Sequence, residues 1–393
     1  MNQNWKFLIL LFALVACESK KDQFIIEEID ALKLELANDQ FQKIKNKRLA
    51  ALERNLLVKE EGDYVDGILH IGQEKVAVSV RLKGDHIDHL EGNRWSLRVK
   101  TKDKRLPEEK FSIQGVATRS YMQEWVFHEL LKQEGVLHLN YQFLDFSIND
   151  TLKGVYAYES HFTNDLLDFN EVEKGPILKI DETEFWNFKN PAPYEGNRDV
   201  YLMKTSPINV YNDSWCEKDS ARKDQMEKAI RLLDDFRKER LPFEEVFDQE
   251  KWAKYIAINE LMQCKHALRW HNLRFYFNPN TELLEPIGFD CGTWFEPVEG
   301  LINYQDDGEP ILMLMYQSTS FKKKVQEYLG AYAHKDFMRK FVRLYFEKIQ
   351  ELESLMKLEK ATYRFWPSTY YQSQRRINDY ISKQSKNDSF WEQ

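Results

Sequence analysis

Residues 271–290 read HNLRFYFNPNTELLEPIGFD and contain two apolar runs around a turn-rich centre. The runs are Leu273 to Phe277 and Leu284 to Phe289, and Asn278-Pro279-Asn280-Thr281-Glu282 separates them. Asn and Pro favour turns, and a short apolar run on each side of a turn is typical of two paired strands. The segment therefore predicts a β-hairpin over residues 272 to 290.

The register of this hairpin decides which side chains share a face. A turn centred on Thr281 predicts that Phe275 lies opposite Ile287 and that Asn272 lies opposite Asp290. Directly opposed residues have Cβ atoms about 4.5–5.5 Å apart. An amide oxygen and a carboxylate oxygen at that spacing suit one hard divalent cation. The alternative is an Asn–Asp hydrogen bond that closes the end of the strands.

The N-terminal half of the chain alternates apolar and polar residues with the period of a strand. A helix is expected to begin at Asp39, and a second one is expected from about residue 120 to Gln133, before Gly135. The expected strands are Ala31 to Leu36, Val65 to Ile71, Val76 to Leu82, Trp95 to Lys100, Phe111 to Gln114, Gln142 to Ile148 and Gly154 to Glu159. This half is predicted to be a mixed, largely antiparallel sheet that carries one internal helix.

The C-terminal half has the period of helices. Asp248 is the expected N-cap of a helix that includes Trp252 and Leu261, and amphipathic helices are expected from Phe321 to Ile381. The sequence therefore predicts an α+β fold. Its expected parts are a sheet-rich lobe over residues 24–190, an irregular connection over 191–219, and a helical lobe over 220–393 that includes the hairpin 272–290.

The first residues read as a bacterial lipoprotein signal. Lys6 precedes an apolar run from Phe7 to Ala13 that is too short to cross a bilayer. Leu14-Val15-Ala16-Cys17 matches the lipobox, in which the cysteine becomes the lipid-bearing first residue. We expect residues 1–16 to be a signal peptide and residues 17–23 to be a tether. Two or three acyl chains on one cysteine give stable membrane anchoring.

The expected location is the bacterial cell envelope, and Glu18 after the lipidated cysteine favours the outer membrane. The formal charge of −8, without a long basic run, argues against a nucleic-acid partner. Cys216, Cys264 and Cys291 show no CxxC spacing, so all three are expected to be free thiols. A Cys264–Cys291 bridge is the alternative.

Several segments occur in a telling order along the chain. They are Arg81-Leu82-Lys83-Gly84, Ser96 to Lys100, Phe111 to Ile113, Ser147 to Asp150 with Gly154 to Tyr156 and Glu159, Ile177 to Asp181, His271 to Tyr276, and Glu285 to Asp290. Together they resemble the spore-coat protein H (CotH) kinase-like family, over about residues 31 to 300. The resemblance implies an atypical protein-kinase-like fold. It also implies ATP with Mg or Mn as cofactor, and secreted or surface proteins as partners.

The resemblance implies roles for charged residues of the sheet and of the helix after it. Lys83 and Arg98 become candidates for contact with the nucleotide phosphates, whose charge they would neutralise. Glu124 is the expected partner that orients Lys83, with Glu129 as the competing choice. Glu159 is expected near the hinge between the lobes. The alternative for each is a solvated charge on a strand or helix.

The same resemblance assigns the metal to Asn272 and Asp290, but the expected catalytic acid is missing. A kinase-type Asp would stand about five residues before Asn272, where this chain has Ala267. No Asp or Glu stands between Glu260 and Glu282. The nearest side chain that titrates in a suitable range for a general base is His266.

A second departure follows Asp290, because the family's frequent second acid is replaced by Gly292. We therefore expect an anchored protein that binds ATP and a divalent cation, with weak or no phosphoryl transfer to protein. The alternative is a pseudokinase that serves as a binding or scaffolding module. A third reading, a polysaccharide hydrolase, needs two carboxylates in a cleft and would use Asp85 and Asp88.

Overall fold

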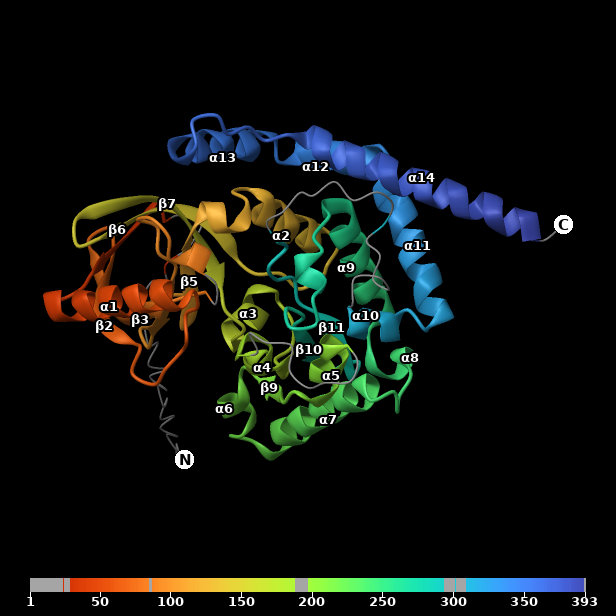
Figure 1. Ribbon diagram of the computed structural model, residues 1–393, viewed down its shortest axis with the longest axis horizontal. Helices are drawn as coiled ribbons and strands as arrows, with labels where there is room; N and C mark the ends of the chain where they lie inside the picture. The colour runs from red at the N-terminus through yellow and green to blue at the C-terminus, as the bar shows by residue number, and fades with distance from the viewer. Residues whose placement is uncertain are drawn as a thin grey trace, which may run out of the picture.

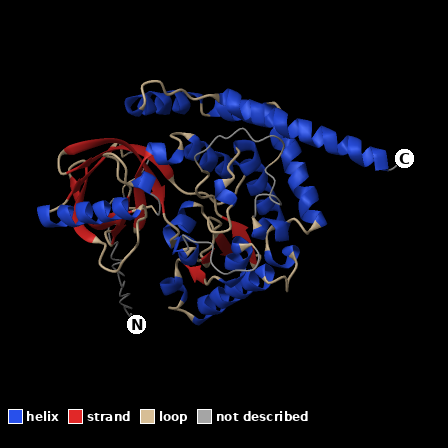
Figure 2. Ribbon diagram, in the orientation of Figure 1, coloured by secondary structure: helices blue, strands red, loops and turns tan. Residues whose placement is uncertain are grey.

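The computed structural model describes residues 24, 29–84, 87–187, 197–292, 301 and 309–391, with side chains as far as residue 383. It has a sheet-rich N-terminal region and a helical C-terminal region, which lie side by side in Figure 1. Figure 2 shows that most of the strands belong to the first region. The predicted α+β class, with sheet first and helices second, is confirmed at this level. Cys17 and Asp85 lie outside the described residues.

Seven strands of the described part of the chain close into a barrel. They are β1 (Ala31–Glu35), β2 (Val65–Ile71), β3 (Glu74–Leu82), β4 (Leu97–Thr101), β5 (Lys110–Gly115), β6 (Tyr141–Ile148) and β7 (Thr151–Ser160). The predicted strands are confirmed, but the expected sheet has no free edge between β1 and β6. Leu34 of β1 pairs antiparallel with Leu69 and parallel with Ile148, so β1 joins both ends of the sheet. Closure of this kind depends on a contact across more than 100 residues, which strand periodicity does not reveal.

Alternation along the strands gives the barrel an apolar inside and a polar outer wall. Leu82, Leu97, Ile113 and Tyr158 are register neighbours on β3, β4, β5 and β7, and all are buried in the barrel core. One residue earlier or later along each strand, the side chains point to the opposite face. That outer row consists of Arg81, Arg98, Ser112 and Glu159. The outer wall of β3, β4, β5 and β7 is therefore where the sequence places its charged side chains.

Helix α1 (Asn38–Arg54) covers the barrel on another side, with Ile44 and Ala51 in the barrel core. Helix α2 (Gln123–Gln133) follows the barrel wall and is buried along most of its length. In Figure 1, α2 lies between the barrel and α9 (Gln249–Met262). Because α9 is apolar all round, it forms the centre of the helical region. Asp248 accepts a hydrogen bond from the backbone N–H of Lys251, so it is the N-cap that the sequence predicts.

The other described helices surround this centre. They are α3 (Asn164–Phe169), α4 (Thr183–Asn187), α5 (Arg198–Thr205), α6 (Asp213–Cys216), α7 (Ser220–Arg237), α8 (Phe243–Val246), α10 (Pro310–Met315), α11 (Thr319–Ala333), α12 (Asp336–Leu344), α13 (Phe346–Glu359) and α14 (Pro367–Trp391). In Figure 1 the last three form a strap across both regions. Glu359 of α13 accepts a hydrogen bond from the backbone N–H of Val155 on β7 (2.8 Å), which ties the strap to the barrel. Among the described helices, none combines the length and the apolar character needed to cross a membrane.

A second sheet lies inside the helical region and contains the hairpin. Its strand order is β11-β10-β8-β9, with β8 (Ile177–Ile180), β9 (Ile208–Val210), β10 (Phe275–Asn278) and β11 (Leu283–Pro286). Two expectations were wrong here. Strand β8 belongs with the helical region although it precedes residue 190, and the described part of 191–219 contains α5, β9 and α6. Asn and Pro in that stretch hid three short elements whose packing partners lie elsewhere in the chain.

The predicted hairpin is present, but its register differs from the expected one by a single residue. Phe275 pairs with Pro286 instead of Ile287, and Tyr276 pairs with Glu285. The turn spans four residues between Asn278 and Leu283, and the backbone N–H of Glu282 donates to the carbonyl of Asn278 (2.8 Å). Phe275 and Tyr276 are both fully buried, in different apolar clusters. Because both faces are buried, the apolar pattern does not select a register, and the turn decides it.

Candidate functional site

A cleft of about 640 Å³ lies between the outer barrel wall and the segments around the hairpin. Its described lining carries eight lysine or arginine side chains and four acidic ones, although the whole chain has a formal charge of −8. The basic residues are Lys59, Arg81, Lys83, Arg98, Lys110, Arg119, Lys179 and Arg274. Ligand pockets of small molecules span roughly 300–1,000 Å³. The cleft therefore suits a small ligand that carries several negative charges.

Lys83 leaves the end of β3 and enters the cleft beside Glu159 of β7. Its ammonium donates to Oε1 of Glu159 (2.5 Å) and to Oε1 of Gln114 (2.8 Å), and Gln114 donates to the other carboxylate oxygen (2.7 Å). Burial lowers the pKa of Lys83 to about 8, while Glu159 acts in the opposite direction. Burial opposes ionisation of Glu159, yet Lys83 and Arg119 lower its pKa to about 2. The pair is therefore ionised at neutral pH.

Arg119 joins this pair to the hairpin, a role that the sequence did not indicate. It ends the turn Val116–Arg119 that follows β5. Its Nη1 lies 3.1 Å from Oδ1 of Asp290, and its Nε lies 4.0 Å from Oε2 of Glu159. One buried guanidinium thus faces the acid of the barrel and the acid of the hairpin. No motif in the sequence marks it, because its two partners lie 40 and 171 positions further along the chain.

Asp290 stands just after the hairpin, in the left-handed region with φ 54°. Burial alone would raise its pKa, but Arg119 and His266 hold the pKa of Asp290 well below its usual range. Its Oδ1 is buried and lies near both cations, yet it accepts no aligned hydrogen bond from a described residue. An ionised carboxylate oxygen without such a partner, in a cleft, fits a divalent cation.

Asn272 reaches Asp290 through His266 rather than across a strand pair. Nδ1 of His266 lies 3.1 Å from the Asn272 amide and 3.3 Å from Oδ1 of Asp290. The expected face-to-face pairing of Asn272 with Asp290 was wrong, because the ladder ends at Phe275 and Pro286. Among the described residues, no group of three or more His, Cys, Asp or Glu side chains forms a metal site. Asp290 and Asn272 therefore fit a cation that takes its remaining ligands from a bound phosphate group and water.

His266, the candidate base, is about half exposed, with 47% of its side chain accessible. Burial lowers the pKa of His266, but Asp290 outweighs burial and raises it overall. A raised pKa keeps more of the imidazole protonated at neutral pH, and a protonated imidazole accepts no proton. The structure places His266 beside Asp290 as a cationic neighbour.

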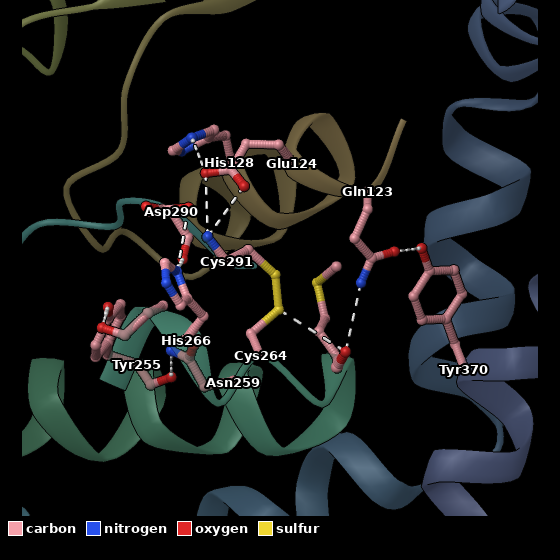
Figure 3. Close-up of a disulfide and its surroundings, with 12 residues drawn as sticks. Gln123, Glu124, His128, Tyr255, Asn259, Cys264, His266, Asp290, Cys291 and Tyr370 are labelled. Carbon is pink, nitrogen blue, oxygen red and sulfur yellow. Dashed lines mark hydrogen bonds and ion pairs between the residues drawn. A yellow bond between two sulfur atoms is a disulfide. The ribbon is translucent and has the colours of Figure 1, made fainter. Parts of the chain in front are cut away.

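Glu124 does not contact Lys83, so the expected orienting pair was wrong. Its carboxylate accepts the backbone N–H of Cys291 (3.0 and 3.2 Å) and lies 3.4 Å from Nε2 of His128. Figure 3 shows Glu124 above Cys291, next to Asp290. The competing choice, Glu129, accepts a hydrogen bond from the Tyr345 hydroxyl (2.6 Å). Glu124 holds the backbone beside the candidate metal ligand, and Glu159 takes the part of lysine partner.

Cys264 and Cys291 form a disulfide with Cα atoms 4.8 Å apart, so the expected free thiols were wrong for this pair. Cys264 follows α9, and Cys291 follows Asp290 directly. The bridge closes a loop that contains His266, Asn272 and Asp290, as Figure 3 shows for its labelled members. Sequence spacing alone did not reveal it, since 27 residues separate the two cysteines. Cys216 is a buried free thiol, as predicted.

Arg98 lies in the same outer row as Glu159, one strand beyond Ser112. Its Nη1 contacts Nδ1 of His161 (2.8 Å), where the arginine donates and the neutral imidazole accepts. Burial and the neighbouring Arg98 hold the pKa of His161 well below its usual range. Of the two acids considered for a hydrolase, Asp88 is exposed at the edge of the cleft.

Comparison with known proteins gives little beyond this geometry. No protein-family model matches the chain, and no curated protein matches it. Among solved structures, the chain is similar to the crystal structure of a Helicobacter pylori proinflammatory kinase, CtkA. The TM-score is 0.23 and the sequence identity 8%, over 74% of this chain and 95% of that chain. A likeness at this level carries no weight for function, which is argued below from the cleft itself.

Proposed function

We propose that the cleft binds ATP together with Mg²⁺ or Mn²⁺, at the end formed by Lys83, Arg119 and Asp290. The observation that carries this proposal is the buried chain of ion pairs from Lys83 through Glu159 and Arg119 to Asp290. It fixes two cations and one carboxylate on opposite sides of one cleft. Magnesium is commonly bound by one or two carboxylates plus substrate phosphates.

The residues of this end would divide the work of binding. Lys83 and Arg119 would neutralise phosphate oxygens, since both side chains line the cleft. Asp290 and the amide of Asn272 would hold the cation, which supplies charge neutralisation between phosphate groups when bound. Glu159 would keep Lys83 and Arg119 in place, because it contacts both. Glu124 and the disulfide would keep the backbone on either side of Asp290 in place.

Binding with weak or no phosphoryl transfer to protein is the activity that these residues support best. The chain has no Asp or Glu between Glu260 and Glu282, where a kinase-type acid would stand. His266 is near, but Asp290 raises its pKa and so disfavours its role as a proton acceptor. Phosphoryl transfer depends mainly on positioning and electrostatics, so a slow rate remains compatible with the site. A pseudokinase that acts as a binding or scaffolding module for a secreted or surface protein is the second candidate, favoured by the missing acid.

The nucleotide proposal is tested by thermal unfolding of the purified protein with ATP and Mg²⁺ or Mn²⁺. A ligand at a hundred times its Kd stabilises the folded state by about 2.7 kcal/mol. We expect a higher Tm with ATP and metal together, a loss of the shift in Asp290→Asn, and an unchanged shift in Glu91→Gln. Glu91 is an exposed acid at the edge of the same cleft, so it is a matched control. An unshifted Tm in the unaltered protein would refute nucleotide binding.

Transfer is tested separately with labelled ATP and casein-like acceptors, or the protein itself. Labelled acceptor that disappears in Asp290→Asn supports a weak kinase. Binding without label in any acceptor supports the pseudokinase.

We also propose that Cys17 is lipidated and anchors the protein in the cell envelope, on the outer membrane. The lipobox Leu14 to Cys17 after a short apolar run supports this. Cells grown with labelled palmitate should yield labelled protein, and Cys17→Ser should abolish the label and release the protein from the membrane fraction. Unlabelled protein in the membrane fraction would contradict lipidation.

A further inference from the structure

The half of the cleft away from Asp290 contains buried cations without acidic partners. Along β4, Ser96 lies beside Lys83, Arg98 is two residues further, and Lys100 lies opposite Lys110. Each two-residue step along a strand covers about 6.6–6.8 Å. Lys110 therefore lies two steps, about 13 Å along the sheet, from the level of Lys83.

Arg98 and Arg274 face each other's surroundings across this half of the cleft. Arg98 is 8% exposed and contacts the ring of His161. Arg274 is 5% exposed and donates to the backbone carbonyls of His271 (2.8 Å) and Leu273 (3.0 Å). The Nε atoms of both arginines are buried without an acceptor among the described residues. Neither arginine forms an ion pair with a described carboxylate, in contrast to Lys83 and Arg119.

Lys110 completes the group from β5. It is half-buried, lines the cleft, and has no hydrogen bond or ion pair to a described residue. Burial and the nearby Arg98 lower the pKa of Lys110 to about 7. A buried cation without a counter-charge destabilises the fold, and a bound anion relieves that cost.

Aromatic rings fix the guanidinium of Arg274 in the cleft. Its Cζ lies 5.0 Å from the ring centre of Phe289, 5.4 Å from Phe162 and 5.7 Å from Tyr211. The ring of Tyr211 also lies 5.3 Å from that of His161, which holds Arg98. Ring faces attract a cation but do not neutralise it. The two arginines are therefore preorganised on connected supports, with their charge available to a ligand.

We propose that Arg98, Lys110 and Arg274 form an anion site for a phosphate group, distinct from the nucleotide end at Lys83 and Asp290. Guanidinium groups match the oxygens of a phosphate with paired hydrogen bonds, and a lysine adds a point charge. The phosphate belongs to the molecule that the protein recognises, so that molecule carries a phosphate group before any transfer. This assigns Arg98 to the recognised molecule instead of to ATP. The site does not depend on nucleotide or metal.

Inorganic phosphate is the probe, titrated by calorimetry into the purified protein in EDTA at constant ionic strength. We expect saturable binding, weakened about tenfold or more in Lys110→Met and in Arg274→Lys, because each charged hydrogen bond contributes about 1.5–3 kcal/mol. Lys100→Met is the matched control: Lys100 pairs with Lys110, is exposed, and is absent from the cleft lining. It should change the affinity less than twofold.

Asp290→Asn separates this site from the nucleotide site. Phosphate binding that survives in Asp290→Asn, and that persists when ATP and Mg²⁺ are saturating, supports a distinct anion site. Phosphate binding that Asp290→Asn abolishes, or that ATP displaces, overturns it. So does an unaltered protein that does not bind phosphate, or that responds equally to potassium chloride. Failure of ATP to bind leaves these readouts intact, so the two proposals fail separately.

Discussion

An alanine at Gly292 would place its Cβ 2.4 Å from the Cβ of His266. Gly292 also has φ +91°, a conformation that side chains rarely adopt. The space in which a second acid would follow Asp290 is therefore filled by His266. The two departures from the kinase-like pattern, Gly292 and His266, are one structural feature.

Gly292→Ala should lower the free energy of unfolding by about 1–3 kcal/mol, because it adds backbone strain and a steric clash next to Asp290. Denaturant unfolding measures this. Gly330→Ala is the control, since Gly330 lies in α11 with no atom near its added Cβ. That variant should be neutral or more stable by about 0.5–1 kcal/mol. Equal effects of the two variants would show that His266 leaves room at position 292.

Glu159→Gln should destabilise the protein strongly, because it leaves Lys83 and Arg119 buried without their shared carboxylate. Removal of one partner from a buried ion pair costs about 3–5 kcal/mol. The double variant Lys83→Met/Glu159→Gln should lose less than the sum of the single variants in chemical denaturation.

The surface pair Lys33–Asp150 is the control for that cycle. Its ion pair has the same length, 2.5 Å, but 85% of the Asp150 side chain is exposed. Asp150→Asn should cost less than about 1 kcal/mol. A similar cost for Asp150→Asn and Glu159→Gln would mean that burial does not govern the Lys83 pair.

Reduction of the Cys264–Cys291 bridge should lower stability and weaken nucleotide binding, because the bridge closes the loop that holds His266, Asn272 and Asp290. Closure of a loop with a separation of 27 residues corresponds to about 3–4 kcal/mol in the chain-entropy model. A reductant should therefore lower the Tm of the unaltered protein and leave that of Cys264→Ala/Cys291→Ala unchanged. Alkylation of the unfolded, unreduced protein should label Cys216 alone of these three cysteines. Label on all three would contradict the bridge.

Glu108 should make stability fall as the pH rises. Burial raises its pKa to about 8, while its partner Ser160 opposes the shift. Between about pH 4.5 and pH 8 the unfolded chain loses this proton and the folded protein keeps it, so ionisation favours unfolding across that window. Glu108→Gln should remove this dependence and raise stability at pH 7 by as much as about 3 kcal/mol, with little change at pH 4.

Glu109→Gln is the matched control for Glu108, because Glu109 is the exposed next residue. Its profile of unfolding free energy against pH should match that of the unaltered protein. A flat profile in the unaltered protein from pH 5 to pH 8 would show that Glu108 ionises normally when folded.

The sequence by itself determined the local elements and the polar character of the cleft wall. Strand alternation predicted the barrel strands because side chains of a strand alternate between two faces whatever the strand pairs with. The same alternation put Arg98 and Glu159 on the face opposite the barrel core. Lys83 and Asp290 were identified as site residues from short motifs, and the structure brings both into one cleft.

Only the tertiary structure decided which of these elements meet. Closure of the barrel through β1 and β6, the hairpin register, the Cys264–Cys291 bridge and the choice of Glu159 over Glu124 all depend on segments far apart in the sequence. Arg119 gained its importance in the same way, because folding brings Glu159 and Asp290 to it from different regions. Local periodicity reflects backbone geometry, whereas such pairings reflect which surfaces the whole chain can bury together.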